Sequence, residues 1–107
     1  MDDTVRFHLA GQVEQARERL DRVLTGQGFQ VRWDSPVQGT AEKGSAVKAA
    51  FLGVFALHYP YLIRLERHGE AVHVTMMVGP SGMAGGVVGQ TRVRAKLAEL
   101  RELLTRS

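Results

Sequence analysis

Two runs of residues with an apolar side chain at every second position, joined by a short turn, constrain the fold of this chain more than any other feature. The runs extend from residue 61 to 65 and from 72 to 78, and their period is that of a β-strand with one buried face. A two-residue loop at Gly69 and Glu70 matches the two faces, and a loop at His68 and Gly69 preserves the same parity. The pairs expected for the first loop are Leu65 with Val74, Ile63 with Met76, and Glu66 with His73. The sequence therefore predicts an antiparallel β-hairpin.

Three further strands are expected in the first half of the chain. Period two appears from Thr4 to Leu9 and from Phe29 to Asp34, and in each run the apolar side chains share one face. Ser35 and Pro36 end the second run, because proline has no N–H to donate within a central strand. The segment from Val37 to Lys43 is expected to follow as a short third strand.

Two amphipathic helices are also expected. Apolar residues recur at helical spacing from Gln12 to Thr25 and from Thr91 to Arg106. Gly26 and Gly28 follow the first helix and can adopt the left-handed conformation that ends a helix. The segment from Ala46 to Leu57 fits a helix or a buried strand, and we favour a short buried helix. The expected apolar stripes are Val13, Ala16, Leu20, Val23 and Leu24 in the first helix, and Val93, Leu97, Leu100, Leu103 and Leu104 in the second.

The order of these elements predicts an α+β fold, with a single antiparallel sheet of four to five strands and two helices packed on one face. A chain of 107 residues can bury one core, so we expect residues 1–107 to form a single globular domain. The strand-helix-strands-helix order is similar, as topology only, to the half-repeat of TATA-box-binding proteins and to helix-grip ligand-binding domains. No motif of either family is present, so the resemblance implies a fold and no function.

The composition of the chain excludes several classes of protein function. The chain has no cysteine, which excludes disulfides, thiolate catalysis and cysteine metal sites. Its first residues are acidic where a signal peptide is positively charged, and its longest nearly uncharged stretch, Ala49 to Tyr61, is too short to span a bilayer. We therefore expect a cytoplasmic protein with no membrane partner. No spacing of histidines, serines or carboxylates fits a metal site or a catalytic triad, so neither an enzyme nor a cofactor is predicted.

The stretch from Gly79 to Gly89 is the most unusual segment, because it contains five of the 12 glycines. Glycines before a helix can let backbone amides approach an anion, but the segment lacks the Walker lysine and the GxGxxG spacing. Tight packing is the simpler interpretation, and a mobile binding loop is the functional one. Met76, Met77 and Met83 cluster near it, and methionine adapts to apolar ligands, so a pocket for an apolar small molecule is one hypothesis. Its candidate ligand-binding residues are Gly82, Met83, Gly85, Gly86 and Gly89.

The face of the sheet opposite the helices is the second candidate surface. Alternation makes it polar and mildly basic, so it could bind a polyanion or a protein partner. The aromatic residues of the same strands point to the core side, which disfavours the stacking of nucleic acid bases. The polar side chains expected on this face are Arg6, His8, Gln30, Arg32, Arg64, Glu66, His73 and Thr75. Of these, the candidate binding residues are Arg6, Arg32, Arg64 and His73.

The sequence therefore predicts a small, non-catalytic binding or interaction domain. Its partner would be a second copy of the chain in a homodimer, another protein, or an apolar small molecule. The alternative hypothesis is the binding of nucleic acid or another polyanion, through the open sheet face or the C-terminal helix. The net charge of +3 can be assigned entirely to residues 91–107, but the missing outward aromatic residues make this the weaker hypothesis.

Overall fold

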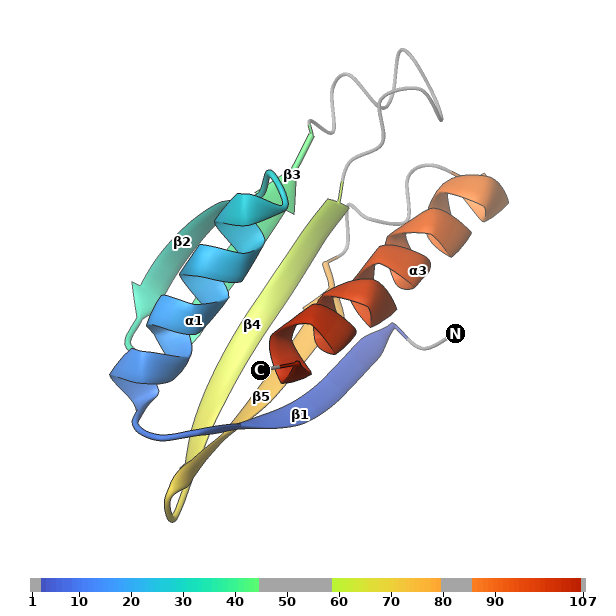
Figure 1. The fold of residues 1–107 in the computed structure, drawn as a ribbon. Helices are drawn as coiled ribbons and strands as arrows, with labels where there is room; N and C mark the ends of the chain where they lie inside the picture. The colour runs from blue at the N-terminus through green and yellow to red at the C-terminus, as the bar shows by residue number, and fades with distance from the viewer. Residues whose placement is uncertain (1–2, 45–58, 80–85, 107) are drawn as a thin grey trace.

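The computed structural model describes residues 3–44, 59–79 and 86–106. Its strands are β1 (Thr4–Ala10), β2 (Gln30–Ser35), β3 (Gln38–Lys43), β4 (Tyr59–His68) and β5 (Ala71–Val78), and its helices are α1 (Val13–Gly26) and α3 (Gly86–Thr105). The five strands form one antiparallel sheet in the order β1-β5-β4-β3-β2. Both helices lie against the same face of this sheet (Figure 1). The predicted α+β fold is confirmed.

The β4–β5 hairpin has the register expected from the sequence. The pairs are Leu65 with Val74, Ile63 with Met76, and Glu66 with His73. Of the two loops considered, the chain uses Gly69 and Glu70, since His68 pairs with Ala71. Gly69 has a φ of +61°, and Glu70 has no positive φ, which matches a type II′ turn with glycine in its first position.

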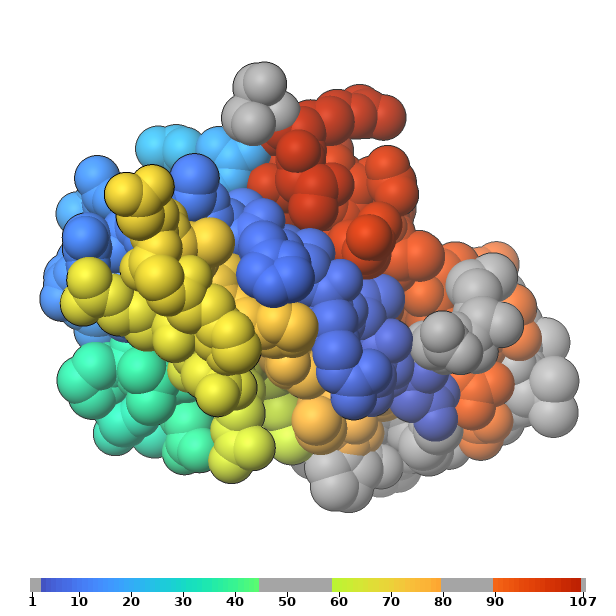
Figure 2. Space-filling view, turned by 90° about the horizontal axis from the view of Figure 1, so that it is seen from below, coloured from blue at the N-terminus to red at the C-terminus, as the bar shows by residue number. Residues whose placement is uncertain are grey.

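The core lies between the sheet and the two helices. α1 contacts β2 and β4, while α3 contacts β1 and β5, so the two helices divide the cover of the sheet between them. Figure 2 shows β1 between β5 on one side and α3 on the other. All of the predicted helix stripe residues are buried or half-buried. The buried residues are Phe7, Leu9, Ala16, Leu20, Leu24, Phe29, Ala41, Tyr61, Ile63, Leu65, Val72, Val74, Met76, Val93, Leu97, Leu100 and Leu104.

The structure corrects two expectations. α3 begins at Gly86 rather than at Thr91, a start that the low helix propensity of glycine concealed. Met76 is buried in the core whereas Met77 is on the opposite face, because neighbouring residues of a strand point to opposite sides. These two methionines therefore do not line one pocket. The helix expected at 46–57 lies outside the described residues.

Trp33 holds α1 against the β2–β3 pair. Its indole N–H donates a hydrogen bond of 2.8 Å to Oδ1 of Asp21 in α1, and the guanidinium of Arg17 lies 6.0 Å from the ring centroid. Trp33 pairs with Gly39 across the strands. A Cβ at residue 39 would lie 2.6 Å from Cε3 of Trp33 and 2.8 Å from the carbonyl oxygen of Arg32. The close approach of the indole therefore requires glycine at position 39.

Tyr61 holds α3 against the central strand. Its hydroxyl donates a hydrogen bond of 2.6 Å to the backbone carbonyl of Val93, and both residues are buried. Burial raises the pKa of the Tyr61 hydroxyl, and the charges of Tyr59 and Glu99 raise it further. The hydroxyl therefore keeps its proton, and continues to donate, at a pH where an exposed tyrosine ionises.

Replacing Gly39 by alanine should lower the free energy of unfolding by about 1–3 kcal/mol, because the added methyl group forces the Trp33 ring or the Arg32 carbonyl to move. Gly26→Ala is the matched control, since nothing lies within 4 Å of its Cβ position and alanine is favoured in a helix. Urea unfolding followed by circular dichroism measures both variants. Equal stability of Gly39→Ala and the unaltered protein would contradict the packing described for Trp33.

Tyr61→Phe should lower the free energy of unfolding by about 1–2 kcal/mol at neutral pH, since the Val93 carbonyl loses a buried donor. This loss should shrink above about pH 10. There the unfolded chain releases the tyrosine proton while the folded chain, with its raised pKa, retains it, so rising pH destabilises only the protein that carries Tyr61. Unfolding is measured between about pH 7 and 11, with Tyr59→Phe as the control. A difference that stays constant with pH would show that Tyr61 ionises normally.

Candidate functional site

The strand register arranges the side chains of the open face, the face opposite α1 and α3, in rows. Each row crosses the sheet from strand to strand, and successive rows are two residues, about 7 Å, apart. The arginine row consists of Arg6, Thr75, Arg64 and Gln38, on β1, β5, β4 and β3. On one side of it lies the apolar pair, Met77 and Leu62, with Thr40 beside Leu62. On the other side lies the histidine row, which consists of His8, His73 and Glu66.

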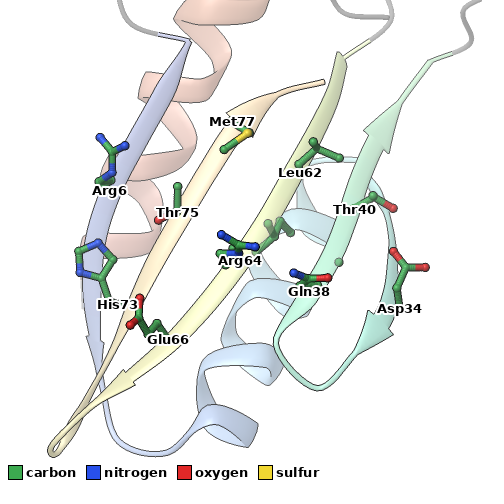
Figure 3. Close-up of a pocket in the computed structure, with 12 residues that line it drawn as sticks. Arg6, Asp34, Gln38, Thr40, Leu62, Arg64, Glu66, His73, Thr75 and Met77 are labelled. Atoms are coloured by element: carbon green, nitrogen blue, oxygen red, sulfur yellow. The ribbon is translucent and has the colours of Figure 1, made fainter. Parts of the chain in front are cut away.

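The open face is hollowed around the arginine row. The first hollow has a volume of about 580 Å³ and is lined by residues of all five strands. Figure 3 shows Thr75 between Arg6 and Arg64, with Met77 and Leu62 toward one end of the sheet. A second hollow of about 510 Å³ shares Thr40 and Leu62 with the first. The two hollows therefore adjoin each other at Thr40 and Leu62.

Within the part of the chain that the structure describes, Arg6 and Arg64 have no ion-pair partner, unlike the acidic groups of the first hollow. No described carboxylate lies within 4.0 Å of either guanidinium. In contrast, Oδ1 of Asp34 lies 3.6 Å from Nε of Arg32, and Oε1 of Glu66 lies 3.4 Å from Nε2 of His68. Each acid of the hollow thus has a basic neighbour, while neither arginine has an acidic one among the described residues.

The apolar pair gives the first hollow an apolar wall. Leu62 is 40% exposed and Met77 is 38% exposed, and they are direct cross-strand neighbours. Val37 is the other large apolar residue with a similar exposure among the described residues, and it lines neither hollow. Leu62 and Met77 are therefore next to Arg6 and Arg64, the two arginines of this hollow that have no ion-pair partner within the described ranges.

The histidine row contains a direct contact between two imidazoles. Nδ1 of His73 lies 3.0 Å from Nε2 of His8, and the ring centroid of His68 lies 5.7 Å from that of His73. In such a contact one nitrogen donates and the other accepts, so the two facing nitrogens share one proton. Glu66 faces His73 across the strands as expected, but the imidazole that its carboxylate contacts is that of His68.

The structure places the four candidate residues on the open face but brings only three of them together, because Arg32 lies on β2, at the opposite edge of the sheet from Arg6. Arg6, Arg64 and His73 line the first hollow, and Arg32 lines the second. The same alternation could have identified further residues that the predicted site omitted, which are Asp34, Gln38, Thr40, Leu62 and Met77. With Asp34 and Glu42 included, three arginines on this face are matched by three acids, so the expected mildly basic character was wrong.

The Gly-rich candidate residues are only partly described. Gly86 and Gly89 lie in the first turns of α3. Gly82, Met83 and Gly85 lie outside the described residues, so the expected pocket near this segment stays a prediction.

Several basic residues of α3 contact the rest of the fold. Arg94 forms an ion pair with Asp3, and Nζ of Lys96 donates to Oε1 of Gln27 at 3.0 Å. Nε of Arg101 donates to the backbone carbonyl of Arg6 at 3.4 Å. The ion pair with Asp3 offsets one of these positive charges, and the two hydrogen bonds hold Lys96 and Arg101 against the fold, so the open face is the stronger candidate site.

No known protein family matches this chain, and no curated protein matches it. Among the described residues, no three histidine or carboxylate side chains are grouped to hold a metal ion. None of the helices in the described ranges is long and apolar enough to cross a membrane. The geometry of the open face is therefore the guide to what this domain binds.

Proposed function

We propose that this chain is a non-catalytic binding domain that holds a small anionic ligand in the first hollow of its open face. The anionic group would lie over Thr75, between Arg6 and Arg64. Because neighbouring strands are about 4.8 Å apart, the two arginines start about 10 Å apart and can approach one anion from both sides. Guanidinium groups form strong, paired hydrogen bonds to oxyanions, and the hydroxyl of Thr75 and the amide of Gln38 supply further donors.

The observation that carries the proposal is the contrast between the arginines and the acids of the hollow. Asp34 and Glu66 have basic neighbours, whereas Arg6 and Arg64 have no carboxylate partner within the described ranges. An anion between the two arginines would gain partners without breaking an existing ion pair.

Shape and charge favour a small molecule over a larger partner. A hollow of about 580 Å³ falls within the usual range of small-molecule sites, about 300–1,000 Å³. The acids of the face would repel a long polyanion about as strongly as its arginines attract one. A second copy of the chain would present the same hollow, and two hollowed faces fill each other poorly.

The described residues of the hollow also favour binding over catalysis. The hydroxyl groups among the described residues of the first hollow are those of Thr40 and Thr75, and neither forms a hydrogen bond to a described histidine or carboxylate. Without a neighbouring base a threonine hydroxyl is a weak nucleophile.

Titration with inorganic phosphate at constant ionic strength, followed by amide chemical shifts, tests the proposal. Shift changes should concentrate at Arg6, Thr75 and Arg64. Replacing both arginines by glutamine should weaken binding tenfold or more, since charged hydrogen bonds contribute about 1.5–3 kcal/mol each. The matched control is Arg22→Gln with Arg92→Gln, which removes the same charge from exposed positions on the helices.

Two results would overturn the proposal. One is equal loss of phosphate binding in the control, which would make net charge the cause. The other is a set of shift changes centred on α3 rather than on the strands. Tighter binding of single-stranded DNA than of phosphate, with a steep salt dependence, would favour the polyanion hypothesis instead.

A further inference from the structure

We propose that the ligand is amphipathic, and that it consists of a single oxyanion head and an unbranched apolar chain. This inference rests on the proposed function, because it places the head between Arg6 and Arg64. The chain then lies over the apolar pair, Met77 and Leu62. A monocarboxylate with a short acyl chain is the simplest molecule of this class.

The distance between head and chain follows from the strand geometry. Leu62 is two residues from Arg64 along β4, and Met77 is two residues from Thr75 along β5. The apolar pair is therefore about 7 Å from the head position, on the same face of the same two strands. A short chain attached to the head can cover that distance inside the first hollow, which all of these residues line.

The direction of the chain follows from the difference between the two neighbouring rows. The histidine row carries the carboxylate of Glu66 and the imidazoles of His8 and His73, which are polar groups that an apolar chain would desolvate at a cost. The apolar pair offers two side chains that are 40% and 38% exposed, which the chain would cover. The chain is therefore directed away from Glu66 and toward Leu62.

The second hollow leaves room for a longer chain. It begins at Leu62 and Thr40 and is lined further along the sheet by Pro60 and Gly79. Its lining contains one acid, Glu42, and one arginine, Arg32, and Arg32 already contacts Asp34, so the second hollow offers less to another anionic group. One charged end and one apolar end thus fit the two adjoining hollows better than two charged ends.

Calorimetric titration with acetate, butanoate, hexanoate and octanoate, all below their aggregation concentrations, tests this inference. Complete burial of a methylene group corresponds to about fourfold tighter binding, so a chain on an open surface should gain about twofold per methylene. Hexanol and hexylamine, which lack the oxyanion, should bind at least tenfold more weakly than hexanoate.

A double variant, Leu62→Thr with Met77→Thr, distinguishes binding of the ligand's apolar chain from binding of its oxyanion head. Both positions are exposed and threonine favours strands, so the fold should be retained, as circular dichroism would verify. Its affinity for acetate should stay within about twofold of that of the unaltered protein, while the gain from acetate to hexanoate disappears. Val37→Thr is the matched control, since Val37 has a similar exposure but lines neither hollow, and it should keep the full gain.

The outcomes distinguish this inference from the proposed function. If acetate and octanoate bind equally, and both need Arg6 and Arg64, the amphipathic ligand is wrong and the anion site stands. If the chain-length gain persists in the threonine variant, the chain binds elsewhere and the inference is also wrong. If none of the carboxylates binds and inorganic phosphate does not bind either, both proposals fail. Binding to anionic vesicles without binding to monomeric hexanoate would indicate a membrane surface as the partner and overturn the inference.

Discussion

The alternation of side chains along β4 and β5 is the constraint on which both faces of the sheet depend. The side chains of Ile63 and Leu65 point toward the helices. By the same alternation, those of Leu62 and Arg64 point to the open face. A slip of one residue would exchange the two sets and place a guanidinium in the core. Because such a slip is costly in free energy, the register of the core side chains also fixes the positions of the side chains on the open face. The candidate site is therefore specified by the packing on the far side of the sheet.

The helices hold this arrangement at two points. Tyr61 connects the central strand to α3 through the Val93 carbonyl, and Trp33 connects β2 to α1 through Asp21. Both residues act on the core side, so the open face carries little of the packing that maintains the fold. Its side chains can vary without loss of the core, and a ligand site built on strands keeps a stable geometry.

Much of the fold could be predicted from the sequence because its signals are local. The alternation at 61–65 and 72–78 predicted the hairpin and its matching faces. It left two loops open, and the observed pairing of His68 with Ala71 decides between them. The start of α3 could not be found in this way, because Gly86 and Gly89 disfavour a helix that the adjoining residues continue. The charge balance of the open face was also missed. Alternation already places Asp34 on the face of Arg32, but the run from Val37 to Lys43 has too few apolar side chains to show which face Glu42 joins, and its pairing with β2 and β4 decides this.

The most direct measurement of how the open face works is the set of intermolecular nuclear Overhauser effects between hexanoate and the methyl groups of the protein. Contacts are expected from the terminal methyl of hexanoate to Met77 and Leu62, and from the methylene next to the carboxylate to the methyl of Thr75. None is expected to the core methyl groups of Val74 and Leu97, which are fully buried on the helix side. Contacts to those core groups, or bound hexanoate without contacts to Met77 and Leu62, would contradict the assignment of the site to the open face.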